Sequence, residues 1–277
     1  MELLSIIRTL EGKANSDRRI VIERYLQRWK IPFQIQNYST GTNLIVKSDK
    51  QPFIGIGSHY DAVTGSPGAN DNGSAMAVTL AVLKRAQTNP LTHFGVQGFF
   101  FDQEESGLLG SRAYVAKHGI KGMLGMINLE LVGQGDQVAI WPVSDQDAGD
   151  IVKGIELAAK GNRLPIHRFD RIIPHDADHR SFREAGMKEA FSLTAISSED
   201  LEVAEHYYRA MEFEVDPPVL QEILSQAPLF KHYHQATDVH EHLSESTLQH
   251  FSNLIWQALQ LLDQSWEKDT SIRTFFQ

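Results

Sequence analysis

Three consecutive phenylalanines, residues 99–101, lead directly into three acids within four positions, Asp102, Glu104 and Glu105. The aromatic run indicates a buried strand. Carboxylates at its end repel one another, and removing them from water is costly unless something offsets their charge. We therefore expect a positively charged partner at the end of this strand.

The rest of the chain alternates between strand and helix patterns. Apolar runs at 53–59, 93–102 and 123–133 indicate core strands, and 73–87 is an almost continuously apolar helical stretch that should be buried on most sides. This alternation predicts an α/β sheet covered by helices on both faces.

Patterns at both ends of the chain frame this sheet. Apolar residues at helical spacing over 21–29 indicate an amphipathic helix that Pro32 ends, and two alternating runs around Thr40–Gly41 indicate a hairpin at a sheet edge. Near the other end, Ser244 is a good N-cap for a last helix with one apolar stripe.

One segment interrupts the alternation. Residues 197–230 are polar, acidic and helical in pattern and contain Pro217–Pro218. Because no linker or change in composition divides the chain, we interpret 1–277 as a single domain with an inserted helical excursion at 197–230. We hypothesise that the excursion overhangs the functional site and that one of its acids receives a substrate ammonium.

Charge and composition exclude several classes of partner. The chain has 26 basic and 35 acidic side chains, a formal charge of −9, and no Lys/Arg cluster, so we expect no nucleic-acid partner. It contains neither a run of eighteen apolar residues nor the pattern of a signal peptide, so we expect no membrane span and a cytoplasmic location. With no cysteine, a metal site would have to use His, Asp and Glu.

Candidate ligands follow the expected strands at their carboxyl ends, where open α/β sheets collect their ligands. They are His59 and Asp61 after 53–59, Asp71 in a glycine-rich loop, Glu104 and Glu105 after the phenylalanine run, Glu130 near the end of 123–133, and a histidine late in the chain.

These residue types suit a pair of divalent cations. Two adjacent ions need a shared carboxylate to screen their repulsion, and Asp71, Glu105 and Glu130 carry −3 against the +4 of two such ions. Adjacent residues leaving a strand point to different sides, so Glu105 can face an ion while Glu104 faces the water that it deprotonates.

Five motifs, in order, resemble peptidase family M28, which includes aminopeptidase Y and glutamate carboxypeptidase II-like enzymes: GSHYDAV, GANDNGS, DQEESGLLGSRAYV, INLELVG and HQATD. The resemblance spans about residues 15–262. It implies a three-layer αβα sandwich around a mixed sheet and two zinc ions per chain. His59, Asp71 and Glu130 would hold one ion, and Asp71, Glu105 and His234 the other. Glu104 matches the general base, Asp61 the carboxylate that orients His59, and the Asp71–Asn72 peptide would be cis.

The match has departures. The family more often has Asp where this chain has Glu130. We choose His234 over its nearest rival His232 because its spacing to Asp238 fits the family pattern. The SDH motif of the family appears as ADH, and its Asp178 and His179 are expected to line the substrate side.

The resemblance implies a zinc-dependent exopeptidase that acts on peptides or small amides, and we favour an aminopeptidase. The alternatives are a glutaminyl cyclase, which uses one zinc ion, a carboxypeptidase or amidohydrolase, and a non-catalytic protein of the same fold. Substrate preference and oligomeric state are not predicted.

Overall fold

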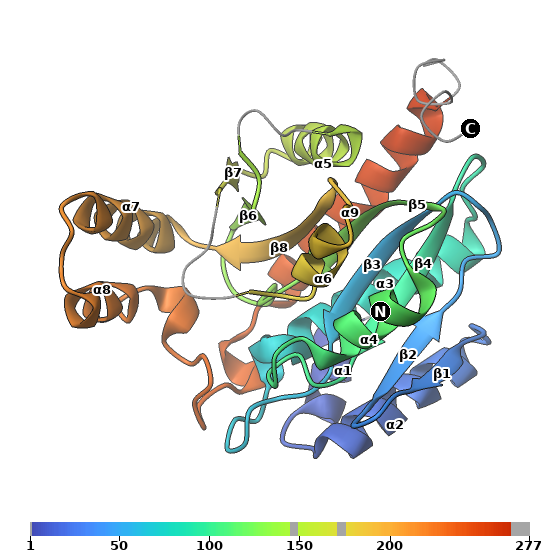
Figure 1. Cartoon of the computed structure of the whole chain (residues 1–277), viewed down its shortest axis with the longest axis horizontal. Helices are drawn as coiled ribbons and strands as arrows, with labels where there is room; N and C mark the ends of the chain where they lie inside the picture. The colour runs from blue at the N-terminus through green and yellow to red at the C-terminus, as the bar shows by residue number, and fades with distance from the viewer. Residues whose placement is uncertain (1, 145–148, 171–175, 267–277) are drawn as a thin grey trace.

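An eight-stranded mixed sheet forms the centre of the protein, in the strand order β1-β2-β4-β3-β5-β8-β6-β7 (Figure 1). The computed structural model describes residues 2–144, 149–170 and 176–266. The strands are β1 (Gln34–Asn37), β2 (Thr42–Val46), β3 (Phe53–His59), β4 (Gly95–Phe101), β5 (Met123–Leu129), β6 (Gln137–Trp141), β7 (Ile166–Arg168) and β8 (Ala190–Ile196).

Four parallel strands, β4, β3, β5 and β8, make up the middle of the sheet. The predicted hairpin, β1 and β2, lies antiparallel at one edge, and β6 runs antiparallel to β8 on the other side. Because β3, β4 and β5 are parallel, the residues that follow them emerge at the same edge of the sheet.

Helices cover both faces of the sheet, which confirms the predicted three-layer αβα sandwich (Figure 1). One face packs against five helices: α1 (Leu3–Leu10), α2 (Asn15–Arg28), α3 (Ala75–Thr88), α5 (Asp150–Gly161) and α9 (Glu245–Ser265). The other face packs against α4 (Leu109–His118) and α6 (His179–Glu184).

The phenylalanine run of β4 contributes side chains to the apolar clusters on both faces of the sheet. Phe99 and Phe101 belong to the apolar cluster beneath α4 and α6, whereas Phe100 belongs to the larger cluster on the opposite face. A strand buried on both faces needs no polar alternation, which explains the continuous run. Each buried phenylalanine contributes about 1.5–3 kcal/mol of transfer free energy.

The element boundaries differ from the sequence patterns in two places. The amphipathic N-terminal segment is a pair of helices, α1 and α2, with Gly12 at a positive φ of 68° between them. Strand β5 ends at Leu129 rather than near 133, so Glu130 is the first residue beyond it. Helix α9 begins as predicted, with Oγ of Ser244 accepting a hydrogen bond from the Thr247 amide.

Residues 198–224 form two helices, α7 (Ser198–Glu212) and α8 (Pro217–Leu224), which pack against each other and project beyond the edge of the sandwich (Figure 1). The side chain of Ser197 caps α7 through a reciprocal pair of hydrogen bonds with Asp200. The return from α8 runs through Pro228–Phe230 toward the carboxyl ends of the central strands, so this segment borders the site described next.

Candidate metal centre

Five side chains that the sequence singles out meet at the carboxyl edge of the sheet. His59 is the last residue of β3, Glu105 follows β4, and Glu130 follows β5. Asp71 comes from the turn Ala69–Ser74 that leads into α3, and His234 from the segment after α8. The peptide between Asp71 and Asn72 is cis, as the family resemblance implies.

The two oxygens of Asp71 face different histidines. Oδ1 lies 3.2 Å from Nε2 of His59, and Oδ2 lies 3.2 Å from Nε2 of His234. Glu130 completes the first group, with Oε2 3.4 Å from Nε2 of His59, and Glu105 the second, with Oε2 3.2 Å from Nε2 of His234. Asp71 therefore stands between two half-sites, the position required of a bridging ligand.

This donor set fits two zinc ions. Zinc takes nitrogen and carboxylate oxygen ligands at about 2.0–2.2 Å in tetrahedral geometry, which sets neighbouring ligand atoms about 3.3 Å apart, close to the separations found here. The second oxygen of Glu105, Oε1, is buried without a hydrogen-bond partner, as a metal ligand would be. His59, Asp71 and Glu105 also have ligand atoms within 4.8 Å of one another.

Ionisation of the cluster reflects its excess of buried acids. Burial raises the pKa of Glu104 well above its ordinary value, and Glu130 adds to the rise. Burial lowers the pKa of His234, but Asp71 and Glu105 outweigh it and raise that pKa to about 9. A cluster that takes up protons in this way is one that cations would stabilise, because each cation replaces bound protons. The positive charge of such cations would offset the repulsion and desolvation of the carboxylates that follow β4.

Asp61 supports the centre in two ways. Its Oδ1 lies 3.4 Å from Nδ1 of His59, and its carbonyl oxygen lies 3.0 Å from the same nitrogen. Its two carboxylate oxygens also accept hydrogen bonds from the amides of Glu104 and Glu105, at 3.1 and 3.2 Å. Sequence reasoning predicted the contact to His59 and missed the second role.

Three further side chains that hold the ligands were missed. Asp238 accepts hydrogen bonds from the amides of Asn70 and Asp71, at 2.7 and 3.1 Å. Nδ2 of Asn72 donates to Oε2 of Glu130 at 2.7 Å. Nδ2 of Asn128 donates to the other oxygen of Glu130 at 2.9 Å. All three lie within the motifs of the resemblance, and this proximity was the only available signal.

The remaining predicted residues, Asp178 and His179, are buried beside the pocket and do not belong to its described lining. Asp178 is fully buried, and burial raises its pKa to about 7. Nδ1 of His179 lies 2.7 Å from Oγ of Ser192, and its ring packs edge-on against Trp141. Trp141 lines the pocket, as do the neighbouring Asp176 and Ala177, so His179 borders the substrate space through Trp141.

The pocket over the centre is acidic on its floor and apolar along one side. Its described lining is His59, Asp71, Glu104, Glu105, Glu130, Leu131, Trp141, Asp176, Ala177, Thr194, Leu229, Phe230 and Tyr233. Of the excursion, only Leu229 and Phe230 appear there. The described lining therefore contains none of the excursion's acids, contrary to the hypothesis that one of them receives a substrate ammonium.

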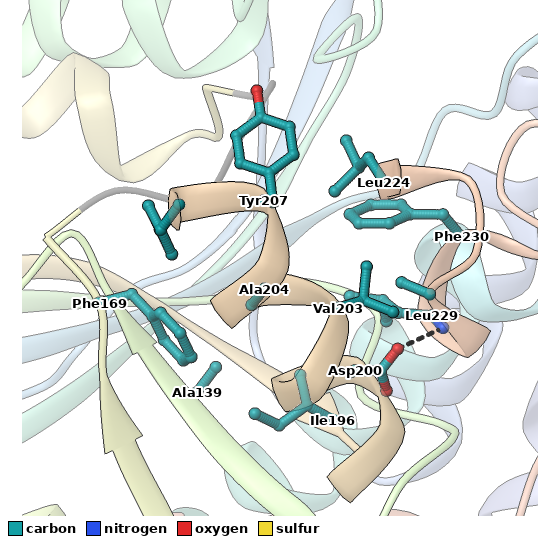
Figure 2. A pocket seen from close by; sticks show the side chains of 12 residues that line it. Ala139, Phe169, Ile196, Asp200, Val203, Ala204, Tyr207, Leu224, Leu229 and Phe230 are labelled. Carbon is teal, nitrogen blue, oxygen red and sulfur yellow. Dashed lines mark hydrogen bonds between the residues drawn. The ribbon is translucent and has the colours of Figure 1, made fainter. Parts of the chain in front are cut away.

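Figure 2 shows the lining of a second pocket, here called the apolar recess. Leu229 and Phe230 line both this recess and the first pocket, so the two adjoin. Asp200 is the one acid among the described residues that line the recess, and its carboxylate already has structural partners, because Oδ1 accepts from the Leu229 amide and Oδ2 from the Ser197 amide. The recess is lined by Ala139, Phe169, Ile196, Asp200, Val203, Ala204, Tyr207, Tyr208, Leu224, Ala227, Leu229 and Phe230.

Comparison with known proteins decides the family. Residues 43–259 match the sequence profile described as peptidase family M28. The chain belongs to peptidase family M28. This membership confirms the resemblance of the five motifs and, with it, a hydrolase of the metallopeptidase class.

Relatives within the family are longer proteins. The chain is 30% identical over 202 residues to endoplasmic reticulum metallopeptidase 1 of Rattus norvegicus, a match that covers 66% of the chain and 22% of that protein. It is 25% identical over 259 residues to a probable lipoprotein aminopeptidase of Mycobacterium tuberculosis, covering 85% of the chain and 50% of that protein. None of the helices in the described residues is both long and apolar enough to cross a membrane.

Solved structures share the fold. BSAP, a zinc aminopeptidase from Bacillus subtilis, superimposes with a TM-score of 0.60 at 25% identity. The match covers 79% of this M28 chain and 49% of the BSAP chain. A glutaminyl cyclase from an Acidobacteriales bacterium superimposes with a TM-score of 0.70 at 18% identity and covers 95% and 94% of the two chains. The second likeness concerns the fold alone.

Proposed function

We propose that this M28 protein is an aminopeptidase with two zinc ions per chain. The observation that carries the proposal is Asp71, which presents one carboxylate oxygen to each of two histidines at 3.2 Å. A carboxylate shared in this way is the element that a two-ion hydrolytic centre requires and a single-ion centre does not.

The charge of the pocket favours a free amino terminus. Of the five carboxylates that line it, those of Asp71, Glu105 and Glu130 are the proposed metal ligands and that of Asp176 pairs with Arg180, which leaves Glu104 to face the substrate. The described lining contains no lysine or arginine. A carboxypeptidase needs a cationic side chain for the terminal carboxylate of its substrate, and the described lining offers none, whereas Glu104 can accept a hydrogen bond from an ammonium. The lining of the pocket therefore favours cleavage from the amino end of a peptide over cleavage from the carboxyl end.

The proposed chemistry is hydrolysis assisted by a general base. The five ligands would hold the zinc ions, which would supply Lewis-acid polarisation of the scissile carbonyl and a lowered pKa of bound water. Oε2 of Glu104 lies 4.0 Å from Nε2 of His59, so it reaches the space above the centre. Glu104 accepts the proton of the attacking water and returns it to the leaving amine as the C–N bond breaks. Asp61 contacts both the ring of His59 and the backbone amide of Glu104 and so holds the two in place relative to each other.

The apolar recess supplies a place for a side chain. Since Leu229 and Phe230 line both pockets, a substrate whose carbonyl lies over the centre can extend a bulky apolar group toward the recess. We propose a preference for large apolar residues such as leucine or phenylalanine at the amino terminus.

A glutaminyl cyclase is the second candidate, because the fold match to such an enzyme covers 94% of its length. Cyclisation of an amino-terminal glutamine needs one zinc ion. The presence of a complete first half-site, formed by His59 and Glu130 with Asp71, beside the second one favours the aminopeptidase.

Metal analysis and substrate assays on one preparation test the proposal. We expect two zinc ions per chain, hydrolysis of leucyl-p-nitroanilide, and no hydrolysis of its N-acetylated form. One ion per chain with turnover of glutaminyl peptides to pyroglutamyl products would favour the cyclase. Equal cleavage of free and acetylated substrates would overturn the aminopeptidase assignment.

A further inference from the structure

Arg18, on α2, is a fully buried arginine next to the metal centre, with 0% of its surface exposed. Its guanidinium donates from Nη1 to the Pro67 carbonyl at 3.2 Å and from Nη2 to the Gly68 carbonyl at 3.0 Å. The third nitrogen, Nε, has no hydrogen-bond partner. Burying an arginine is expensive, and two carbonyl contacts recover only part of the cost, so its position calls for a reason beyond packing.

The carbonyls that Arg18 holds lie just before the bridging aspartate. Gly68 precedes the turn Ala69–Ser74, adopts a positive φ of 68°, and its carbonyl also accepts from the Gly73 amide at 3.1 Å. A Cβ added to Gly68 would lie 2.4 Å from Nη1 of Arg18. The backbone thus approaches the guanidinium as closely as only glycine permits.

Two charged side chains form hydrogen bonds with the backbone of residues 67–71. Asp238 accepts from the amides of Asn70 and Asp71, while Arg18 donates to the carbonyls of residues 67 and 68. Between them they fix the backbone on both sides of Ala69. The carboxylate of Asp71 has to present one oxygen to each half-site, so a small shift of this backbone would favour one half-site at the expense of the other.

Charge supports the same role. Burial lowers the pKa of Arg18 to about 10. The carboxylates of Asp71, Asp61, Asp238 and Glu105, in that order of strength, raise this pKa and so partly offset the effect of burial. Arg18 is thus a fixed cation beneath a group of acids that repel one another. It lies outside residues 43–259, which match the family profile, so the family motifs did not indicate it.

We propose that Arg18 is a positioning residue that holds the 67–71 backbone so that Asp71 bridges both zinc half-sites. This inference rests on the proposed two-ion centre and concerns metal binding, not the identity of the substrate. Removing Arg18 leaves no orphan carbonyl, because Pro67 also accepts from the Gly12 amide and Gly68 from the Gly73 amide. The variant is therefore expected to fold.

The test uses Arg18→Met, Arg18→Lys and the control Arg19→Met. Arg19 is the next residue on the same helix, and in the described residues its guanidinium forms a half-buried ion pair with Glu23, at 2.7 Å, away from the 67–71 backbone. Each protein is dialysed against buffered free zinc, and the bound zinc is counted. Thermal midpoints are measured with chelator and with saturating zinc.

We expect Arg18→Met to bind its weaker zinc ion about 10- to 100-fold less tightly, as found when supports of metal ligands are removed. The rise in midpoint that zinc produces should shrink in Arg18→Met and stay at the wild-type value in Arg19→Met. A purely structural role would instead lower the midpoints with chelator and with zinc equally, and that result would overturn the proposal.

Arg18→Lys separates geometry from charge and carries the test if Arg18→Met fails to fold. A lysine keeps the charge but cannot reproduce the two-pronged contact, so it should bind zinc as weakly as Arg18→Met. Full recovery of zinc binding by Arg18→Lys would overturn positioning through the two carbonyls. A wild-type protein that binds two ions but cleaves no peptide would refute the proposed activity and leave this inference standing.

Discussion

The side chain of Asp61 lies against the ring of His59, with Oδ1 3.4 Å from Nδ1, on the side of the ring opposite to the bridging Asp71. The same Nδ1 also lies 3.0 Å from the carbonyl oxygen of Asp61, and the two contacts together favour the tautomer in which Nε2 is free to bind a metal ion. The same carboxylate receives the amides of Glu104 and Glu105. Asp61 therefore links a ligand of one half-site to a ligand of the other.

Asp61→Asn should weaken zinc binding about 10- to 100-fold, because an amide can accept only one of the two backbone hydrogen bonds and interacts weakly with the imidazole. Competition with a chelator measures the affinity. Asp49→Asn, at an exposed position, is the control. Unchanged affinity in Asp61→Asn would show that the carboxylate of Asp61 contributes nothing to the centre and that the backbone carbonyl alone orients His59.

Glu104→Gln should retain both zinc ions and lower kcat by about 10²- to 10⁴-fold, the range for loss of a general base. Glutamine has the same shape and cannot accept the proton. Metal content and steady-state kinetics on leucyl-p-nitroanilide check the two parts separately, with Glu199→Gln on the exposed face of α7 as the control. Turnover near the wild-type rate would assign the base to another residue.

The parts of this protein that follow local rules were predictable from its sequence. The buried run of β4, the N-cap at Ser244 and the polar residues after β3, β4 and β5 all carry short-range signals of a strand, a helix start or a strand end. Since parallel strands bring their carboxyl ends together, predicting the sheet also predicted where His59, Glu105 and Glu130 meet.

The parts that depend on long-range partners were not predictable. Arg18 has the pattern of a solvated residue on an amphipathic helix, and only the tertiary structure reveals the carbonyls 50 residues away that it contacts. His232 and His234 are equivalent by residue type, and only the spacing of His234 to Asp238 in the family pattern separated them. In the structure, the ring of His232 stacks on His242 at 4.0 Å while His234 faces Asp71.

Ala204→Phe should lower kcat/KM for leucyl substrates about 10- to 200-fold and leave alanyl substrates almost unchanged. Ala204 lines the apolar recess, and a phenyl group there would fill the space proposed for a large side chain (Figure 2). His206→Phe adds the same group on the exposed side of α7 and serves as the control. An equal loss on both substrates would mean that the recess does not select the side chain.

Glu189 should make stability depend on pH far from the metal centre. Its Oε1 accepts from the amides of Ile151 and Val152 at the start of α5, at 2.9 and 3.3 Å, yet burial raises its pKa from 4.5 to about 7. The folded protein therefore holds a proton that the unfolded chain releases above pH 4.5. The resulting stability is complete below that pH and is lost as the pH rises through about 7.

Glu189→Gln keeps an acceptor for those amides and removes the titration. At fixed zinc concentration, the free energy of unfolding of Glu189→Gln relative to the wild type should rise between pH 5 and pH 8 and level off above that. Glu184→Gln, at an exposed position on α6, is the control. Denaturant titrations at each pH provide the measurement, and a flat difference for Glu189→Gln would mean that the folded protein does not hold this proton.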